Sequence, residues 1–92
     1  GYDHNYVLLP SVEGQPQAKV ASSDTGICMS LYTDLPGLQF YTGSLQSTSQ
    51  LGALCLEPQY FPDSPNRPEF PDCIATPEAP YKAYIRYTFE HI

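Results

Sequence analysis

Three side chains of the sequence have the chemistry to bind and deprotonate a polar ligand: those of Asp3, Gln39 and Glu57. A carboxylate accepts protons and hydrogen bonds, and a neutral amide offers both a donor and an acceptor. Gln39 faces away from its apolar neighbours Leu38 and Phe40, as any exposed glutamine would. Asp3 precedes a strand, where an aspartate equally well caps a turn. Residue type alone therefore does not distinguish a ligand-binding role of Asp3 and Gln39 from an ordinary surface position.

Glu57 is the strongest candidate for acid–base chemistry. It ends the apolar run 54–56, where desolvation would raise the pKa of its carboxyl toward neutral pH, as a general base requires. Cys55 shares its face of an extended chain and is small enough to leave room for a ligand. The alternative is an edge-strand glutamate in water, or one in a salt bridge with Arg67 or Arg86.

Other polar residues are explained by local structure. His4 follows Asp3 directly, and neighbouring residues of an extended chain point to opposite faces, so the two do not form one pair. Asp63 and Asn66 stand in a proline-rich turn, where side-chain bonds to the backbone account for both. We expect no metal site, because the 3 cysteines lack the paired spacing of zinc or redox motifs: Cys28, Cys55 and Cys73.

Composition excludes several classes of partner. The 92 residues carry 4 Lys and Arg against 10 Asp and Glu, a net charge of −6 that repels nucleic acid and anionic lipid. No apolar run approaches the roughly 20 residues that span a bilayer. Residues 1–5 have neither the basic start nor the apolar stretch of a targeting signal. Together with unpaired cysteines, this predicts a cytoplasmic protein with no nucleic-acid or membrane partner.

The elements that must position these side chains are strands. The chain has 10 prolines and 6 glycines and no segment with a helical apolar period, so it is predicted to be all-β. In the clearest strand, alternation predicts one buried face, which includes Ile85, Tyr87 and Phe89, and one wetter face. A turn at 23–26 predicts a hairpin between two of the other strands. The predicted strands cover residues 6–9, 18–22, 27–33, 38–42, 53–57 and 81–90.

Two segments are predicted to be loops. Repeated prolines withdraw backbone donors across 61–80, so this segment should be an ordered, irregular loop. The Ser- and Gln-rich stretch 44–50 is predicted to be a flexible loop. Because the first residues run directly into a strand, we also expect the chain to begin in the middle of a fold, with further strands upstream.

Three segments, in this order, resemble the aldose 1-epimerase (galactose mutarotase) family. The final part of the chain, from Phe70 through the last strand, is also similar, so the resemblance covers nearly the whole sequence and corresponds to the C-terminal portion of a member. Ser44 stands where the family usually has Asn, and 44–51 is shorter than the usual connection. The three segments are GYDHNYVL at 1–8, TDLPGLQFYTG at 33–43 and CLEPQYFPDSPN at 55–66.

The resemblance implies an antiparallel β-sandwich like the C-terminal part of the mutarotase supersandwich. It also implies a cofactor-free reaction that interconverts the α and β anomers of galactose or glucose through ring opening. Glu57 is then the general base at the anomeric C1 hydroxyl, Asp3 orients the ring through its hydroxyls, and Gln39 is a further substrate-binding amide. His4 has no catalytic role in the family. The general acid is a histidine upstream of these residues, as are a second histidine and an arginine that bind substrate.

Residues 1–92 are therefore expected to form a single unit, the C-terminal part of a sandwich whose N-terminal strands are absent. Such a unit exposes apolar faces and strand edges, so we expect a homo-oligomer or a companion N-terminal chain. On this hypothesis the chain is a mutarotase piece that is inactive alone and acts on a hexose when complemented. The alternative is a non-catalytic protein, either a carbohydrate binder or a structural remnant that folds by self-association.

Overall fold

The computed structural model describes residues 1–43 and 53–92, in which almost every regular element is a β-strand. The loop predicted at 44–50, and the short connection at 44–51, lie outside the described residues. No helix of the described chain is long and apolar enough to cross a membrane. The strands are β1 (Asp3–Val7), β2 (Ala18–Ser22), β3 (Ile27–Thr33), β4 (Gly37–Tyr41), β5 (Cys55–Gln59) and β6 (Ile85–His91), and one 3-10 helix, η1, covers Ser64–Asn66.

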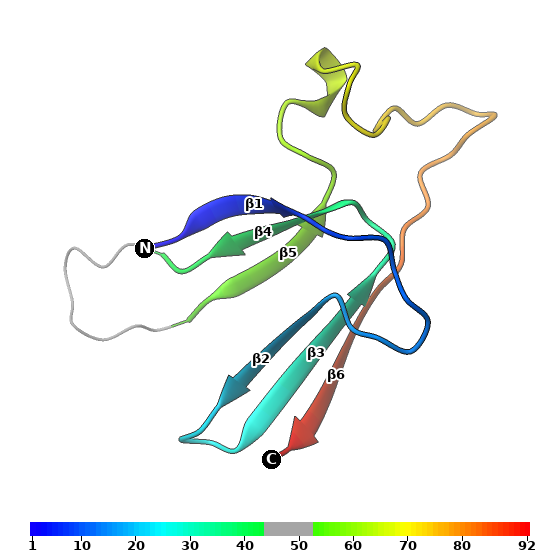
Figure 1. The fold of residues 1–92 in the computed structure, drawn as a ribbon. Helices are drawn as coiled ribbons and strands as arrows, with labels where there is room; N and C mark the ends of the chain where they lie inside the picture. Colours follow the sequence, from blue (N-terminus) through cyan, green and yellow to red (C-terminus); the bar gives the residue numbers. More distant parts are fainter. Residues whose placement is uncertain (44–52) are drawn as a thin grey trace. The chain divides into compact units, whose positions relative to one another are not determined.

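The chain forms two compact units, each built on one three-stranded antiparallel sheet. The first unit consists of Gly1–Leu8 and Leu35–Tyr81, and the second of Leu9–Asp34 and Lys82–Ile92. The strand order is β1-β4-β5 in the first sheet and β2-β3-β6 in the second (Figure 1). This architecture confirms the all-β prediction and is consistent with a β-sandwich. The expectation of a single unit stays a prediction.

The edge position of β5 explains how this strand accommodates a proline. The strand covers Cys55–Gln59 rather than the predicted 53–57, and it includes Pro58, which lies opposite Leu38 of the central strand. Proline is tolerated at sheet edges because one row of edge N–H groups has no strand to bond. β1 likewise begins at Asp3 rather than at residue 6, since every residue from Asp3 to Val7 pairs with β4.

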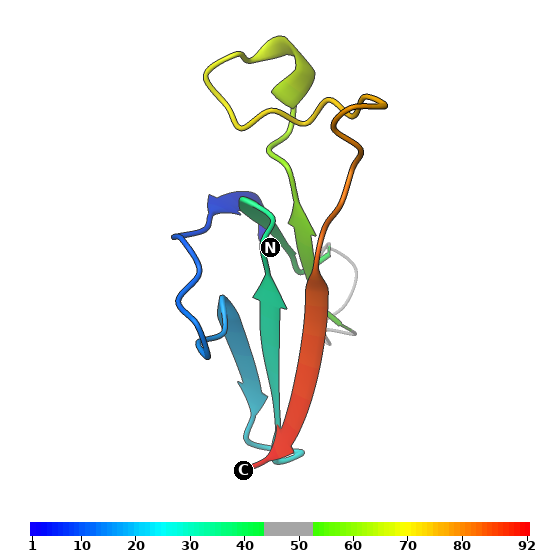
Figure 2. The same cartoon turned by 90° about the vertical axis from the view of Figure 1, so that its right-hand side faces the viewer.

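The second sheet is organised around β3. The predicted strands at 18–22 and 27–33 are confirmed with the same bounds, and they form the expected hairpin. In its turn Gly26 has a φ of 74° and donates its N–H to the Ser22 carbonyl at 2.9 Å, a conformation that glycine adopts without steric cost. β6 runs along the other side of β3 (Figure 2), and the side chain of Leu31 is fully buried.

Two side chains at the end of β3 fix the point where β6 begins. The strand starts at Ile85 rather than at residue 81. Tyr84, directly before it, has its carbonyl oxygen bonded by the Thr33 hydroxyl at 2.7 Å and its N–H bonded to Oδ1 of Asp34 at 2.9 Å. The carbonyl and the N–H of Tyr84 are thus bonded by these two side chains instead of by the backbone of a neighbouring strand.

The face of β6 that was predicted to be buried is exposed in the described chain. Ile85, Tyr87 and Phe89 are 46%, 42% and 66% exposed, so the prediction of a buried face is wrong for these residues. The sequence of the strand alternates, but its burial does not, since every residue except Thr88 is exposed. Exposed aromatic and aliphatic side chains in one strand favour association with another apolar surface.

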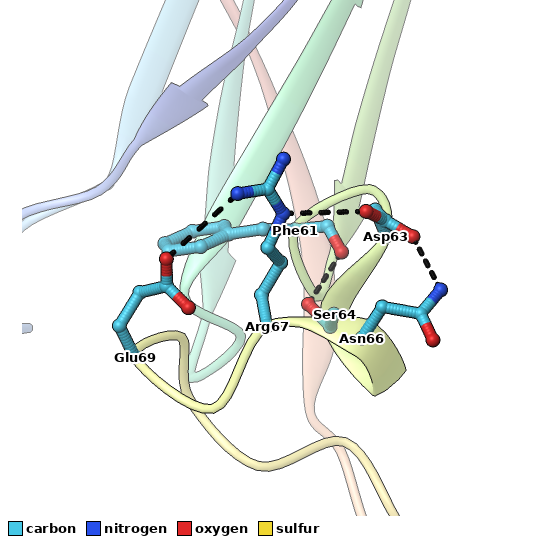
Figure 3. A network of polar contacts seen from close by, with 6 residues as sticks. All are labelled: Phe61, Asp63, Ser64, Asn66, Arg67 and Glu69. Atoms are coloured by element: carbon cyan, nitrogen blue, oxygen red, sulfur yellow. Dashed lines mark hydrogen bonds and ion pairs between the residues drawn. The ribbon is translucent and has the colours of Figure 1, made fainter.

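The proline-rich segment that follows β5 is held by local polar contacts (Figure 3). Asp63 has a φ of 64° and accepts a hydrogen bond from Nδ2 of Asn66 at 2.6 Å. The Ser64 hydroxyl donates to the Phe61 carbonyl, and η1 begins at Ser64. Asp63 and Asn66 therefore help to fix a turn, as their sequence setting predicted, but through a bond between their side chains rather than through the predicted side-chain bonds to the backbone.

Replacing Thr33 by valine tests the anchor of β6. Valine keeps the shape of the side chain but leaves the Tyr84 carbonyl without its donor, so we expect the free energy of unfolding to fall by about 1–3 kcal/mol in urea titrations. Asp34→Asn is the matched control, because the amide oxygen still accepts from Tyr84, and it should cost about 0.5 kcal/mol or less. Equal losses in the two variants would contradict the anchor.

Candidate functional site

The first sheet brings the three candidate side chains onto one face. Asn5, Gln39 and Glu57 are direct partners across β1, β4 and β5, so their side chains lie in one line across the sheet. Asp3 is two residues from Asn5 on the same strand and therefore shares this face. Strand pairing thus brings together polar side chains that are far apart in the sequence. We call the set formed by Asp3, Asn5, Gln39, Glu57 and Gln59 the polar row.

A chain of directed hydrogen bonds connects four members of the polar row: Asp3, Asn5, Gln39 and Gln59. Nε2 of Gln39 donates to Oδ1 of Asp3 at 2.7 Å. Nε2 of Gln59 donates to Oε1 of Gln39 at 3.1 Å and to Oδ1 of Asn5 at 3.0 Å. The two glutamines and Asn5 are half-buried, whereas Asp3 is exposed. The carboxylate therefore lies at the accessible end of an ordered amide network.

Asn5 and Gln59 are the members of the polar row that the sequence interpretation missed. The signal that identifies them is the period of two: Asn5 follows Asp3 by two residues, and Gln59 follows Glu57 in the same way. A polar residue at each second position of two strands places four polar side chains on one face. Without the pairing register, nothing indicates that the two strands share a sheet.

Gly37 makes the contact between Asn5 and Gln59 possible. It lies opposite Gln59 in the β4–β5 pair and is buried. A Cβ atom at this position would stand 2.6 Å from Oδ1 of Asn5 and 2.9 Å from Cδ1 of Phe61. Both distances are shorter than any side chain tolerates, so the absence of a side chain here is a structural requirement of the amide network.

Both arginines proposed as partners of Glu57 are engaged elsewhere. Nε of Arg67 lies 3.3 Å from Oδ2 of Asp63, and the guanidinium of Arg86 lies over the Tyr32 ring at 4.5 Å. Glu57 is exposed on its face of the sheet. Within the described residues its carboxylate is therefore open to a ligand, and the desolvation expected of a general base stays a prediction.

Neither histidine of the described chain belongs to the polar row. His4 occupies the opposite face of β1, where its ring packs near Tyr2 and Tyr6 at centroid distances of 5.8 and 6.5 Å. Its Nδ1 accepts a hydrogen bond from the Asp3 backbone N–H at 3.2 Å. His91 belongs to β6 in the second unit. In the described chain, no group of three or more histidine, cysteine, aspartate or glutamate side chains could hold a metal ion.

Together, fold and site define an all-β protein with a row of carboxylates and amides across one sheet. The sequence model of the family described as aldose 1-epimerase matches residues 1–88. The chain belongs to the aldose 1-epimerase family.

Curated relatives agree with this assignment. The chain is 38% identical to the aldose 1-epimerase of Escherichia coli (strain K12) over 101 residues, which cover 97% of the chain and 29% of that protein. It is 37% identical to the galactose mutarotase of Mus musculus over 99 residues, with the same two shares. For the galactose mutarotase of Homo sapiens the identity is 35% over 91 residues, or 88% of the chain and 27% of that protein. The chain thus spans less than a third of the length of these relatives.

Gly37→Ala is expected to break the contact between Asn5 and Gln59. Its Cβ overlaps the Asn5 side chain, so overpacking should lower the free energy of unfolding by about 1–3 kcal/mol in urea titrations. Gly14→Ala serves as control, because nothing lies within 4 Å of its Cβ position and only its φ of 79° opposes the change. A Gly37→Ala variant as stable as the parent chain would contradict the close approach.

Proposed function

We propose that this chain supplies the base and part of the sugar-binding surface of a mutarotase acting on galactose or glucose. The observation that carries the proposal is the polar row, in which strand pairing aligns Glu57 with Gln39 and places Asp3 beside them. Carboxylate and amide groups on one accessible face match the hydroxyl groups of a hexose, each of which both donates and accepts a hydrogen bond. Family membership supports the reaction type.

The proposed roles follow from the chemistry of ring opening. Opening a cyclic hexose requires removal of the proton from the C1 hydroxyl while the ring oxygen gains a proton. Glu57 is the base, since it is the open carboxylate opposite Gln39 on the exposed edge strand. Asp3 and Gln39 hold hydroxyls of the ring and so orient C1 toward Glu57. Rotation of the free aldehyde and closure with reversed proton transfers then give the other anomer, without a cofactor.

The general acid must come from outside the polar row. Neither histidine of the described chain is a member of it, since His4 is on the far face of β1 and His91 belongs to the other unit. We propose that a preceding polypeptide segment supplies an acid histidine, either in the same chain or as a companion, and that the 92 residues alone do not catalyse mutarotation. The free thiols of the 3 cysteines support a cytoplasmic location.

A second candidate is a non-catalytic protein that binds a hexose or folds by self-association. The exposed apolar side chains of β6 favour it, because such a face is stabilised by a second copy as well as by a companion segment. Hexose binding without turnover, in the presence of the preceding segment, would support this candidate over the enzyme.

Polarimetry on freshly dissolved α-D-galactose tests the proposed enzyme. The chain alone should leave the spontaneous rate unchanged. Mixing it with a polypeptide covering the part of the E. coli aldose 1-epimerase that precedes the matched region should accelerate mutarotation. In this mixture Glu57→Gln should lower the rate about 10²- to 10⁴-fold, because the amide cannot take the C1 proton.

Glu13→Gln is the matched control for the Glu57 variant. Glu13 is an exposed glutamate of the second unit, so the same loss of one charge there should leave the accelerated rate unchanged. Acceleration by the chain alone would show that it carries its own acid. Full activity of Glu57→Gln would contradict the role of Glu57 as the base.

A further inference from the structure

We infer that Gln59 and Asn5 are positioning residues, which set the orientation of the Gln39 amide and, through it, of the Asp3 carboxylate. The inference rests on the proposed function for its ligand, a hexose. The bonds that carry it, however, lie entirely within the first unit and can be measured without a sugar.

The orientation of Gln39 is determined by what lies on each side of it. An ionised Asp3 can only accept hydrogen bonds, so the Gln39 amide must turn its NH₂ group toward Oδ1, as observed at 2.7 Å. Turning the amide over would place its oxygen against the carboxylate and its NH₂ group against the NH₂ group of Gln59. Both contacts would be repulsive, so Gln59 selects the orientation that serves Asp3.

Gln59 is itself oriented by Asn5. An amide NH₂ group has two protons, and Nε2 of Gln59 directs them to two different oxygens, Oδ1 of Asn5 at 3.0 Å and Oε1 of Gln39 at 3.1 Å. With both protons engaged, the NH₂ group points into the network and cannot exchange places with Oε1 without losing two bonds. Gly37 supplies the space that this arrangement needs.

The result is a matched donor and acceptor at the exposed end of the network. The bond between Gln39 and Asp3 uses one Nε2 proton and one carboxylate oxygen, so Oδ2 of Asp3 and the second Nε2 proton of Gln39 can serve a ligand at this end of the network. A sugar hydroxyl needs one acceptor and one donor, so this pair suits one hydroxyl or two neighbouring ones. Losing the positioning residues should therefore weaken sugar binding without removing any group that touches the sugar.

Gln59→Met in the full 92-residue chain tests the inference by NMR. Methionine has a similar length but no hydrogen-bond donor, so the Gln39 amide loses the bond to its oxygen and is held only by its bond to Asp3. In the parent chain the side-chain ¹⁵N–¹H signals of Gln39 should shift on the substitution Asp3→Asn, which removes the carboxylate that accepts from Nε2. In Gln59→Met this shift should be clearly smaller, because the amide is held on one side only, while the backbone amide spectrum stays that of the folded chain. Galactose binding should weaken about tenfold, the effect of one lost hydrogen bond.

Gln17→Met is the matched control, because Gln17 bonds Ser11 in the second unit and should leave the Gln39 signals unchanged. If Gln59→Met does not fold, Asn5→Ala removes the other anchor of Gln59 and should reduce the same shift. A Gln39 shift that is retained in the folded variants would overturn the inference. A shift that is reduced, in a chain that binds no galactose even with the preceding segment present, would support the positioning role and overturn the proposed function instead.

Discussion

The candidate site depends on the register with which β4 pairs to β1 on one side and to β5 on the other. This register aligns Asn5, Gln39 and Glu57, which are separated by long stretches of sequence. A slip of one residue in either pair would send a whole strand's polar side chains to the opposite face. Gly37 helps to define the register, since only at its position can the side chains of Asn5 and Gln59 meet.

The two faces of the first sheet differ in composition: one carries packed aromatic rings and the other carries the polar row. On one face His4, Tyr2 and Phe40 form a cluster of rings, with Tyr2 and Phe40 at a centroid distance of 5.3 Å. On the other face the side chains of the polar row are exposed or half-buried, and hydrogen bonds connect Asp3, Asn5, Gln39 and Gln59. An ordered amide network next to open carboxylates is a preorganised surface, which binds a polar ligand at a smaller entropic cost than mobile side chains do.

Local patterns were sufficient to predict the elements, because alternation and turn residues act over a few positions. They identified β2 and β3 with their observed bounds, and the turn formed by Asp63 and Asn66. They failed where contacts between distant residues determine the bounds of a strand. β6 begins at Ile85 rather than at residue 81 because Thr33 and Asp34 bond the backbone of Tyr84. The roles of Asn5 and Gln59 were missed for the same reason, since they appear only when three strands are paired. Asp3, Gln39 and Glu57 were selected by residue type and by family resemblance, and their roles stay predictions.

The central claim is that the polar row is the face that meets the sugar. Titrating the ¹⁵N-labelled chain with galactose tests it most directly, with the side-chain amides of Asn5, Gln39 and Gln59 and the ring of His4 as reporters on opposite faces. The account predicts that galactose shifts the amide signals of the polar row and leaves those of His4 unchanged. Shifts confined to His4 and its aromatic neighbours, or none in the polar row, would contradict it.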